Sequence, residues 1–250
     1  EMKQKGELKT LLDKWFAAPD PLQKTEKKTG SISTKTVIKM LGRGFAITIF
    51  TAVLSLLIGF AIAIPAGVIL NNPDLWGHRL LRWINDFIRG TPVLIQLFFI
   101  YFGLGSKEVG LNLTPVTAAI ITLSINASAY MSEVIRSGLM AVNPGQLKAG
   151  QALGLSKAQV FIHIVWPQAF RIALPALMNS VVALLKDTAL ISVISVGEVI
   201  REAQSIISVT FNPVKYYLIV AVMFFIVTFP LMKYSGYLER KIKSRGFSND

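Results

Sequence analysis

Polar side chains that could bind a solute are scattered through the apolar parts of this 250-residue sequence. Amides and hydroxyls can donate and accept hydrogen bonds, and burying them without a partner is costly. Each such residue therefore lines a polar cavity or hydrogen-bonds a neighbouring helix. The candidates for contact with a polar solute are Gln96, Asn126, Tyr130, Asn179 and Ser180.

Charged side chains beside the apolar runs form a second group. We interpret Lys186 and Asp187, which are adjacent, as neutralising each other or a neighbouring helix rather than binding a ligand. Arg89, Glu133 and Arg136 lie near the predicted inner boundary of the apolar runs. We expect them to form ion pairs that hold a gate and the loop that follows.

The sequence contains few residues that could catalyse a reaction or bind a metal ion. The chain has no cysteine and two histidines, which excludes thiolate sites and argues against a histidine-built metal centre. It has no phosphate-binding G-x-x-x-x-G-K-[ST] loop and no Ser/His/Asp arrangement. We therefore expect a protein that is not an enzyme and holds no cofactor of its own.

Five uncharged runs make up the elements that must position these residues. The chain is 52% hydrophobic and only 16% charged, with a mean hydropathy of +0.53, unlike ordinary soluble domains. About 20 apolar residues are enough to cross a bilayer. We predict an all-α integral membrane protein with five transmembrane helices, near 45–70, 89–106, 113–132, 170–194 and 214–236.

The positions of Lys and Arg predict the orientation of these helices. The segment from 233 onward holds five basic residues, so the positive-inside rule places the C-terminus in the cytoplasm. Counting back through five crossings places 71–89 and 133–170 inside and the N-terminus outside. The net charge of +12 is then mainly an orientation signal, except for ten basic residues in 1–43. Long translocated domains ignore the rule, so these residues indicate a domain outside the membrane.

The N-terminal segment has its own pattern. Residues 1–16 place Leu8, Leu12 and Trp15 on one helical face, and 17–34 are rich in Pro, Lys, Thr and Ser. A helix this short is marginal alone in water, so it should pack on something. The residues support equally a helix lying on the bilayer and a helix docked on a further domain.

The longest internal loop, 133–170, carries a short predicted helix within 143–157. Asn143 can begin this helix, Gly154 can end it, and Ser156 can cap a second piece. Small residues allow a partner surface to approach closely, and they gather here at Ala149, Gly150 and Ala152. An ordinary amphipathic connector would explain the length of the loop but not this cluster.

This loop resembles the EAA motif of bacterial ABC importer permeases, whose cytoplasmic coupling helix docks in a cleft of the ATPase subunit. The family pattern is Glu-Ala-Ala, three residues, Gly, nine residues, Ile, one residue and Leu-Pro. Aligned on Gly154, the triplet falls on Lys148, Ala149 and Gly150, and the Leu-Pro on 166–167. Lys148 thus replaces the acidic residue, and Gly150 lowers the helix propensity by about 1 kcal/mol relative to Ala.

Further motifs resemble the polar amino acid uptake subfamily of these permeases, at 89–92, 125–130, 133–136, 144–146 and 185–188. The resemblance implies a type I ABC importer-like fold with five helices and an outer N-terminus. It also implies that 1–34 are the end of a solute-binding domain plus a linker, and that 35–250 are the permease domain.

The resemblance implies the partners as well. These are a dimer of ATPase subunits that bind ATP and Mg²⁺, a second and most simply identical permease copy, and a separate or fused solute-binding protein. The location would be the bacterial cytoplasmic membrane, with no nucleic acid as partner. The residues expected to couple to the ATPase are Gln146, Lys148, Ala149, Gly150, Ala152, Leu153 and Gly154.

The polar candidates then acquire an expected cargo, an amino acid carried by alternating access. Relatives that import basic amino acids often have Glu where this chain has Ser180, so a cationic side chain would lack a partner. We expect a neutral or acidic polar amino acid such as glutamine, whose zwitterionic head group suits Asn126 and Asn179.

Other functions stay open at this point. An importer of basic amino acids or of a quaternary-amine osmolyte would keep the class, and the osmolyte would require an aromatic box. An ion channel or a membrane scaffold would change the class, but no filter-like segment is visible. Neither a channel nor a scaffold needs a small-residue docking helix inside the cell.

Overall fold

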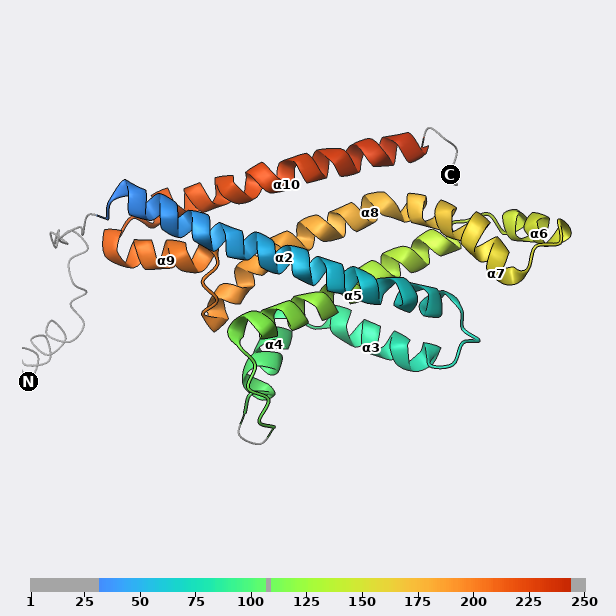
Figure 1. The fold of residues 1–250 in the computed structure, drawn as a ribbon, viewed down its shortest axis with the longest axis horizontal. Coiled ribbons are helices and arrows are strands. Elements are labelled where there is room, and N and C mark those ends of the chain that lie inside the picture. The colour runs from blue at the N-terminus through green and yellow to red at the C-terminus, as the bar shows by residue number, and fades with distance from the viewer. Residues whose placement is uncertain (1–31, 107–108, 244–250) are drawn as a thin grey trace, which may run out of the picture.

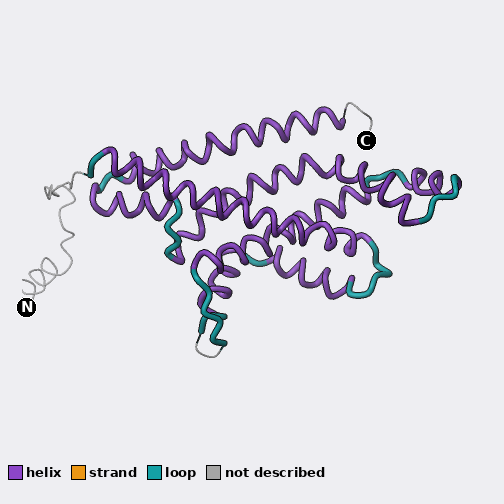
Figure 2. Tube along the Cα trace, in the orientation of Figure 1, coloured by secondary structure: helices purple, strands orange, loops and turns teal. Residues whose placement is uncertain are grey.

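The computed structural model describes residues 32–106 and 109–243, and every regular element within them is helical (Figure 1, Figure 2). The predicted all-α fold is confirmed. The elements are α2 (Thr34–Asn71), α3 (His78–Gly90), α4 (Val93–Phe98), η1 (Phe99–Gly103), α5 (Pro115–Met140), α6 (Pro144–Ala152), α7 (Lys157–Val160), η2 (Phe161–Val165), α8 (Trp166–Asp187), η3 (Thr188–Ile194), α9 (Val199–Thr210) and α10 (Pro213–Lys243). The predicted binding-domain remnant, 1–16, lies outside the described residues.

Four described helical stretches are long and apolar enough to cross a membrane: Thr34–Asn71, Pro115–Met140, Lys157–Ile194 and Pro213–Ile242. They run along the long axis of the molecule, with α9 near one end and α6 near the other (Figure 1). They correspond to the first, third, fourth and fifth predicted spans, and each is longer than predicted. Helices continue past the apolar run until a cap or a turn ends them. The number of five spans and the orientation of the termini remain predictions.

Small residues allow α2 and α5 to pack closely. A Cβ atom at Gly59 would lie 3.0 Å from the Ser124 carbonyl oxygen, and one at Gly67 would lie 2.8 Å from that of Ser132. Small residues at helix crossings are typical of membrane proteins, where backbone packing rather than water exclusion drives helix association. The α2–α5 pair forms the central body, and α8 packs on it through Ala173.

The predicted second span, 89–106, is interrupted where α3 ends. Thr91 has an extended backbone with φ −115° and ψ 145°, and Pro92 is the N-cap of α4. A proline disfavours helical geometry in the residue before it, which explains the break. The apolar helix that follows, Val93–Gly103, is shorter than the four long stretches. This break between α3 and α4 forms one wall of the candidate site.

A buried carboxyl group joins α9 to the beginning of α2. Glu198 has no exposed surface, and its Oε1 accepts a hydrogen bond from the Arg201 amide at 2.8 Å as the N-cap of α9. Thr48 Oγ1 donates to Glu198 Oε2 at 3.4 Å. Burial raises the pKa of Glu198 to about 7, because the charged form loses its hydration.

We expect the detergent-extracted protein to lose stability as the pH rises from about 5 to about 8. The pKa of Glu198 is higher in the folded state than in the unfolded state, so its contribution is present at low pH and disappears as the pH passes about 7. Glu198→Gln, which is neutral and keeps the capping oxygen, should flatten the pH dependence of the Tm. An exposed-carboxyl control, Asp74→Asn, should keep the wild-type dependence. An unchanged slope in Glu198→Gln would contradict the assignment.

Candidate functional site

A cavity of about 490 Å³, lined by both polar and apolar residues, lies between α5, α8 and the break that separates α3 from α4. Its volume is in the usual range for small-molecule sites. The polar residues that line it are Thr91, Asn126, Tyr130, Asn179, Ser180 and Asp187. Four of the five solute-contact candidates selected from the sequence therefore lie around one cavity.

Gln96, the fifth candidate, is not among the residues that line this cavity. Its Nε2 donates to the Ile88 carbonyl oxygen at 2.7 Å and to Thr91 Oγ1 at 3.0 Å. Its Oε1 accepts a hydrogen bond from Asn126 Nδ2 at 3.2 Å. Gln96 uses its hydrogen bonds to hold the α3–α4 break and to orient Asn126, and contact between Gln96 and a solute remains a prediction.

Two amide side chains present opposite hydrogen-bonding groups from opposite walls. Asn126 on α5 is 8% exposed, and its Nδ2 is held by Gln96, so its Oδ1 remains as an acceptor. Asn179 on α8 accepts a hydrogen bond from Ser235 Oγ at 3.0 Å through its Oδ1, which leaves its Nδ2 as a donor. One wall can therefore accept from a cationic group while the other donates to an anionic one.

Tyr130 and Ser180 lie where the cavity extends toward α6. The Tyr130 hydroxyl donates to the Arg89 carbonyl oxygen at 3.3 Å, and the Arg89 guanidinium lies over the tyrosine ring, 5.7 Å from its centroid. Ser180 Oγ donates to the Ala176 carbonyl oxygen at 3.2 Å. Both residues also line a second cavity, described below.

Asp187 is a functional candidate that the sequence analysis assigned to a structural pair. It lines the cavity, whereas Lys186 lines a separate cavity of about 270 Å³ beside Tyr217. No ion pair within 4.0 Å joins Asp187 to any described residue. Neighbouring residues point about 100° apart around a helix, so Lys186 attracts Asp187 electrostatically but forms no ion pair with it within 4.0 Å. The sequence feature that could have identified Asp187 is its spacing from Ser180. Seven residues are about two helical turns, so the two side chains lie on the same face of α8.

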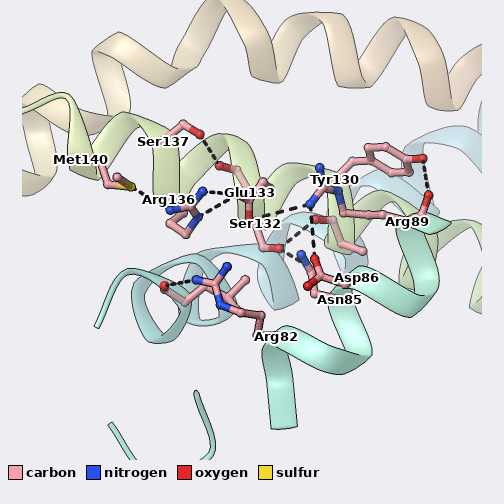
Figure 3. A network of polar contacts seen from close by, with 12 residues as sticks. Arg82, Asn85, Asp86, Arg89, Tyr130, Ser132, Glu133, Arg136, Ser137 and Met140 are labelled. Atoms are coloured by element: carbon pink, nitrogen blue, oxygen red, sulfur yellow. Dashed lines mark hydrogen bonds and ion pairs between the residues drawn. The ribbon is translucent and has the colours of Figure 1, made fainter. Parts of the chain in front are cut away.

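A network of charged residues joins α3 to α5 (Figure 3). Arg89 Nη1 lies 3.8 Å from Asp86 Oδ1 and 4.0 Å from Glu133 Oε2. Arg136 Nε donates to Glu133 Oε1 at 2.8 Å. The ion pairs expected among Arg89, Glu133 and Arg136 are present, and they join the end of α3 to α5. A second cavity of about 330 Å³ adjoins the network, with Arg89 and Glu133 in its wall.

The predicted coupling helix is α6, at the end of the molecule far from α9 (Figure 1). Asn143 is its N-cap and accepts a hydrogen bond from the Gly145 amide at 2.7 Å, as the sequence indicated. Ser156 caps α7 in the same way, as part of a capping box. The predicted coupling residues with exposed side chains or backbone are Gln146, Lys148, Ala149, Ala152, Leu153 and Gly154.

Gly150 differs from the other predicted coupling residues because it is buried. A Cβ atom there would lie 2.9 Å from both Val160 Cγ2 and Ile164 Cδ1. The absent side chain therefore lets α6 pack on the helix that follows it, and Gly150 offers no surface to a partner in this structure. Gly150 therefore serves internal packing in this structure, and a docking role for it remains a prediction.

Gly154 ends α6 in a left-handed conformation, with φ +82°. The Leu155 amide donates to the Gly150 carbonyl at 3.2 Å, and the Gly154 amide donates to that of Gln151 at 2.9 Å. These two bonds form a Schellman motif, which satisfies carbonyls at a helix end and strongly favours glycine. The glycine predicted to stop the helix therefore does so through its backbone.

The family of binding-protein-dependent transport system inner membrane components matches residues 59–244 of this chain. The arginine transport system permease protein ArtQ of Bacillus subtilis is 34% identical over 211 residues, which cover 83% of this chain and 94% of that protein. The glutamine transport system permease protein GlnP of Escherichia coli is 35% identical over 206 residues, with 82% and 94% covered. The nopaline transport system permease protein NocM of Agrobacterium fabrum is 37% identical over 190 residues, with 73% and 79% covered.

Solved structures resemble the fold over most of its length. The crystal structure of an amino acid ABC transporter with histidines gives a TM-score of 0.75 at 32% identity, covering 84% of this chain and 99% of that chain. An inward-facing structure of the MetNI methionine ABC transporter gives 0.70 at 20% identity, with 87% and 100% covered. The second likeness concerns the fold alone.

Proposed function

Because the chain belongs to the family of binding-protein-dependent transport system inner membrane components, we propose that it forms the translocation pathway of an ATP-driven amino acid importer. The observation that carries this proposal is the cavity in which one carboxylate, two amides and several hydroxyls converge. Polar groups within spanning helices are costly to bury, so their convergence favours passage of a polar solute. The relatives named for arginine, glutamine and nopaline transport support an amino acid as that solute.

The cavity suits the two charges that every amino acid carries. Asp187, without an ion-pair partner among the described residues, would bind the α-ammonium group, and Asn126 Oδ1 would accept a further hydrogen bond from it. Asn179 Nδ2 and the hydroxyls of Ser180 and Tyr130 would face the α-carboxylate or a polar side chain. The amino acid would thus lie across the cavity between α5 and α8.

The charge of the cavity favours a neutral side chain, such as that of glutamine. Asp187 is the one charged residue that lines the cavity within the described residues, and the α-ammonium group of the substrate uses it. A second cation on an arginine or lysine substrate would be buried without a partner, and Ser180 stands where a further acid would be needed. An acidic side chain would still find donors there.

We propose that partner subunits, which bind ATP and Mg²⁺, hydrolyse ATP and so supply the energy for transport. The sequence has no phosphate-binding loop of its own, and α6 presents exposed side chains at the end of the spanning helices. A second permease copy, most simply an identical one, and a separate or fused solute-binding protein would complete the importer in the cytoplasmic membrane. The exposed residues assigned to coupling are Gln146, Lys148, Ala149, Ala152, Leu153 and Gly154.

Purification and reconstitution test the proposal. The chain, extracted from membranes with its solute-binding component, is expected to bring an ATPase subunit with it. In proteoliposomes, L-glutamine should stimulate ATP hydrolysis several-fold and should accumulate inside, whereas glycine betaine should do neither. Stimulation by arginine but not glutamine would overturn the neutral substrate and leave the amino acid importer standing. Absence of any co-purifying ATPase would contradict the importer itself.

A further inference from the structure

The second cavity, of about 330 Å³, continues the first one toward α6. The two cavities share Tyr130 and Ser180, one from α5 and one from α8. Beyond these residues the second cavity is lined by Glu133 and Ser137, which follow Tyr130 along α5 in the direction of α6. The second cavity therefore lies next to the first, on the side of α6.

Arg89, which lines this cavity, leaves part of the hydrogen-bonding capacity of its guanidinium unused. Its Nε is buried and has no hydrogen-bond partner among the described residues. Its contacts with Asp86 and Glu133, at 3.8 and 4.0 Å, are longer than hydrogen bonds. A buried donor without a partner destabilises the protein, so an acceptor that reached the Arg89 guanidinium would relieve this cost.

Glu133 is bound mainly by Arg136, and its ion pair with Arg89 is the longer of the two. Arg136 donates to Glu133 Oε1 from both Nε and Nη2 (Figure 3). The Glu133 side chain is 20% exposed and the Arg89 side chain 34%, so both remain accessible from the cavity that they line. The cavity wall thus holds a cation and an anion close together, which matches the two charged ends of a zwitterion.

We propose that the second cavity is an inner binding position for the transported amino acid, in which Arg89 binds its α-carboxylate. This inference rests on the proposed function, because the first cavity must deliver the amino acid. The planar guanidinium can donate two parallel hydrogen bonds to a carboxylate. Glu133 and the Ser137 hydroxyl line the space in which the α-ammonium group would lie. As the amino acid moves toward α6, its α-ammonium group would leave Asp187 in the first cavity and its α-carboxylate would bind Arg89 in the second.

Cysteine protection can report on each cavity separately, because the chain contains no cysteine. Ser137 and Ala183 are both exposed; Ser137 lines the second cavity, and Ala183 lines the first. L-glutamine and L-arginine are added to the purified complex that carries Ser137→Cys or Ala183→Cys, and N-ethylmaleimide alkylation of this chain is timed. We expect the transported amino acid to slow alkylation in both variants.

Arg89→Gln supplies the decisive comparison. Combined with Ser137→Cys, it should raise the amino acid concentration that gives half-protection by at least about tenfold, because a charge-assisted bond to the carboxylate is lost. Combined with Ala183→Cys, it should change that concentration less than about twofold. A purely structural role of Arg89 would shift both cavities together. Arg89→Lys should give an intermediate shift in the second cavity, because it keeps the charge without the planar fork.

Asp86→Asn is the matched control, since it removes the other acidic neighbour of Arg89 and no cavity-lining group. Protection in Ser137→Cys should survive this change. Protection in Ala183→Cys but not in Ser137→Cys, or protection in Ser137→Cys that Arg89→Gln leaves unchanged, would overturn the inner position alone. Absence of protection in both variants by either amino acid would overturn the proposed function together with it.

Discussion

Asp187→Asn is expected to lower the maximal rate of amino acid uptake by about 30-fold or more. Asn keeps the size of the side chain and removes the negative charge that would bind the α-ammonium group in the first cavity. Loss of a partly buried, charge-assisted contact costs about 2 kcal/mol, which corresponds to that factor. The solute-binding component would set the response to external concentration, so the defect should be read from uptake into proteoliposomes at saturating amino acid.

The adjacent Lys186 provides the matched control for this change. It is exposed and lines a different cavity, so Lys186→Gln should reduce uptake less than about threefold. If the two residues instead neutralised each other, as their adjacency in the sequence indicated, both variants would be impaired to a similar degree. Equal losses in the two variants would therefore contradict the assignment of Asp187 to the cavity.

The course of the helices shows where the sequence was informative. Long uncharged runs predicted the four long helical stretches of the described residues, because helices exposed to lipid must be apolar. The second run contains the shorter apolar helix Val93–Gly103, which begins after Thr91 and Pro92, where a local backbone restriction separates it from α3. Hydropathy averages over about 20 residues, so it does not register one extended residue.

The site was predicted in part, for reasons that the side chains make clear. Asn126, Tyr130, Asn179 and Ser180 were selected as polar residues within apolar helices, and they line the same cavity. Gln96 met the same criterion, but backbone carbonyl groups and Asn126 take its hydrogen bonds, which its residue type does not indicate. A polar residue in a spanning helix can serve a cavity or another side chain, and composition does not distinguish them.

Gly154→Val is expected to reduce uptake and coupled ATP hydrolysis by about tenfold while membrane insertion stays normal. No atom lies within 4 Å of a Cβ built at this position, so the residue has room for a side chain. The obstacle is the backbone, since φ +82° is unfavourable for an L-residue by about 1–2 kcal/mol and is worst for β-branched ones. The end of α6 would therefore rearrange, and with it Leu153, which is 81% exposed.

Gly154→Asn tests whether the loss of uptake in Gly154→Val comes from the backbone conformation or from the added side chain on the surface. Asn tolerates the left-handed conformation better than Val and has a similar volume, so it should preserve the Schellman motif and keep uptake within about threefold of the wild type. Both variants are compared for uptake, for stimulated ATP hydrolysis and for co-purification of the ATPase subunit. Equal loss in both variants would mean that the bare glycine surface contacts the ATPase. Loss in Val alone would mean that Gly154 acts by fixing the end of α6, so that the exposed residues before it face the partner in one orientation.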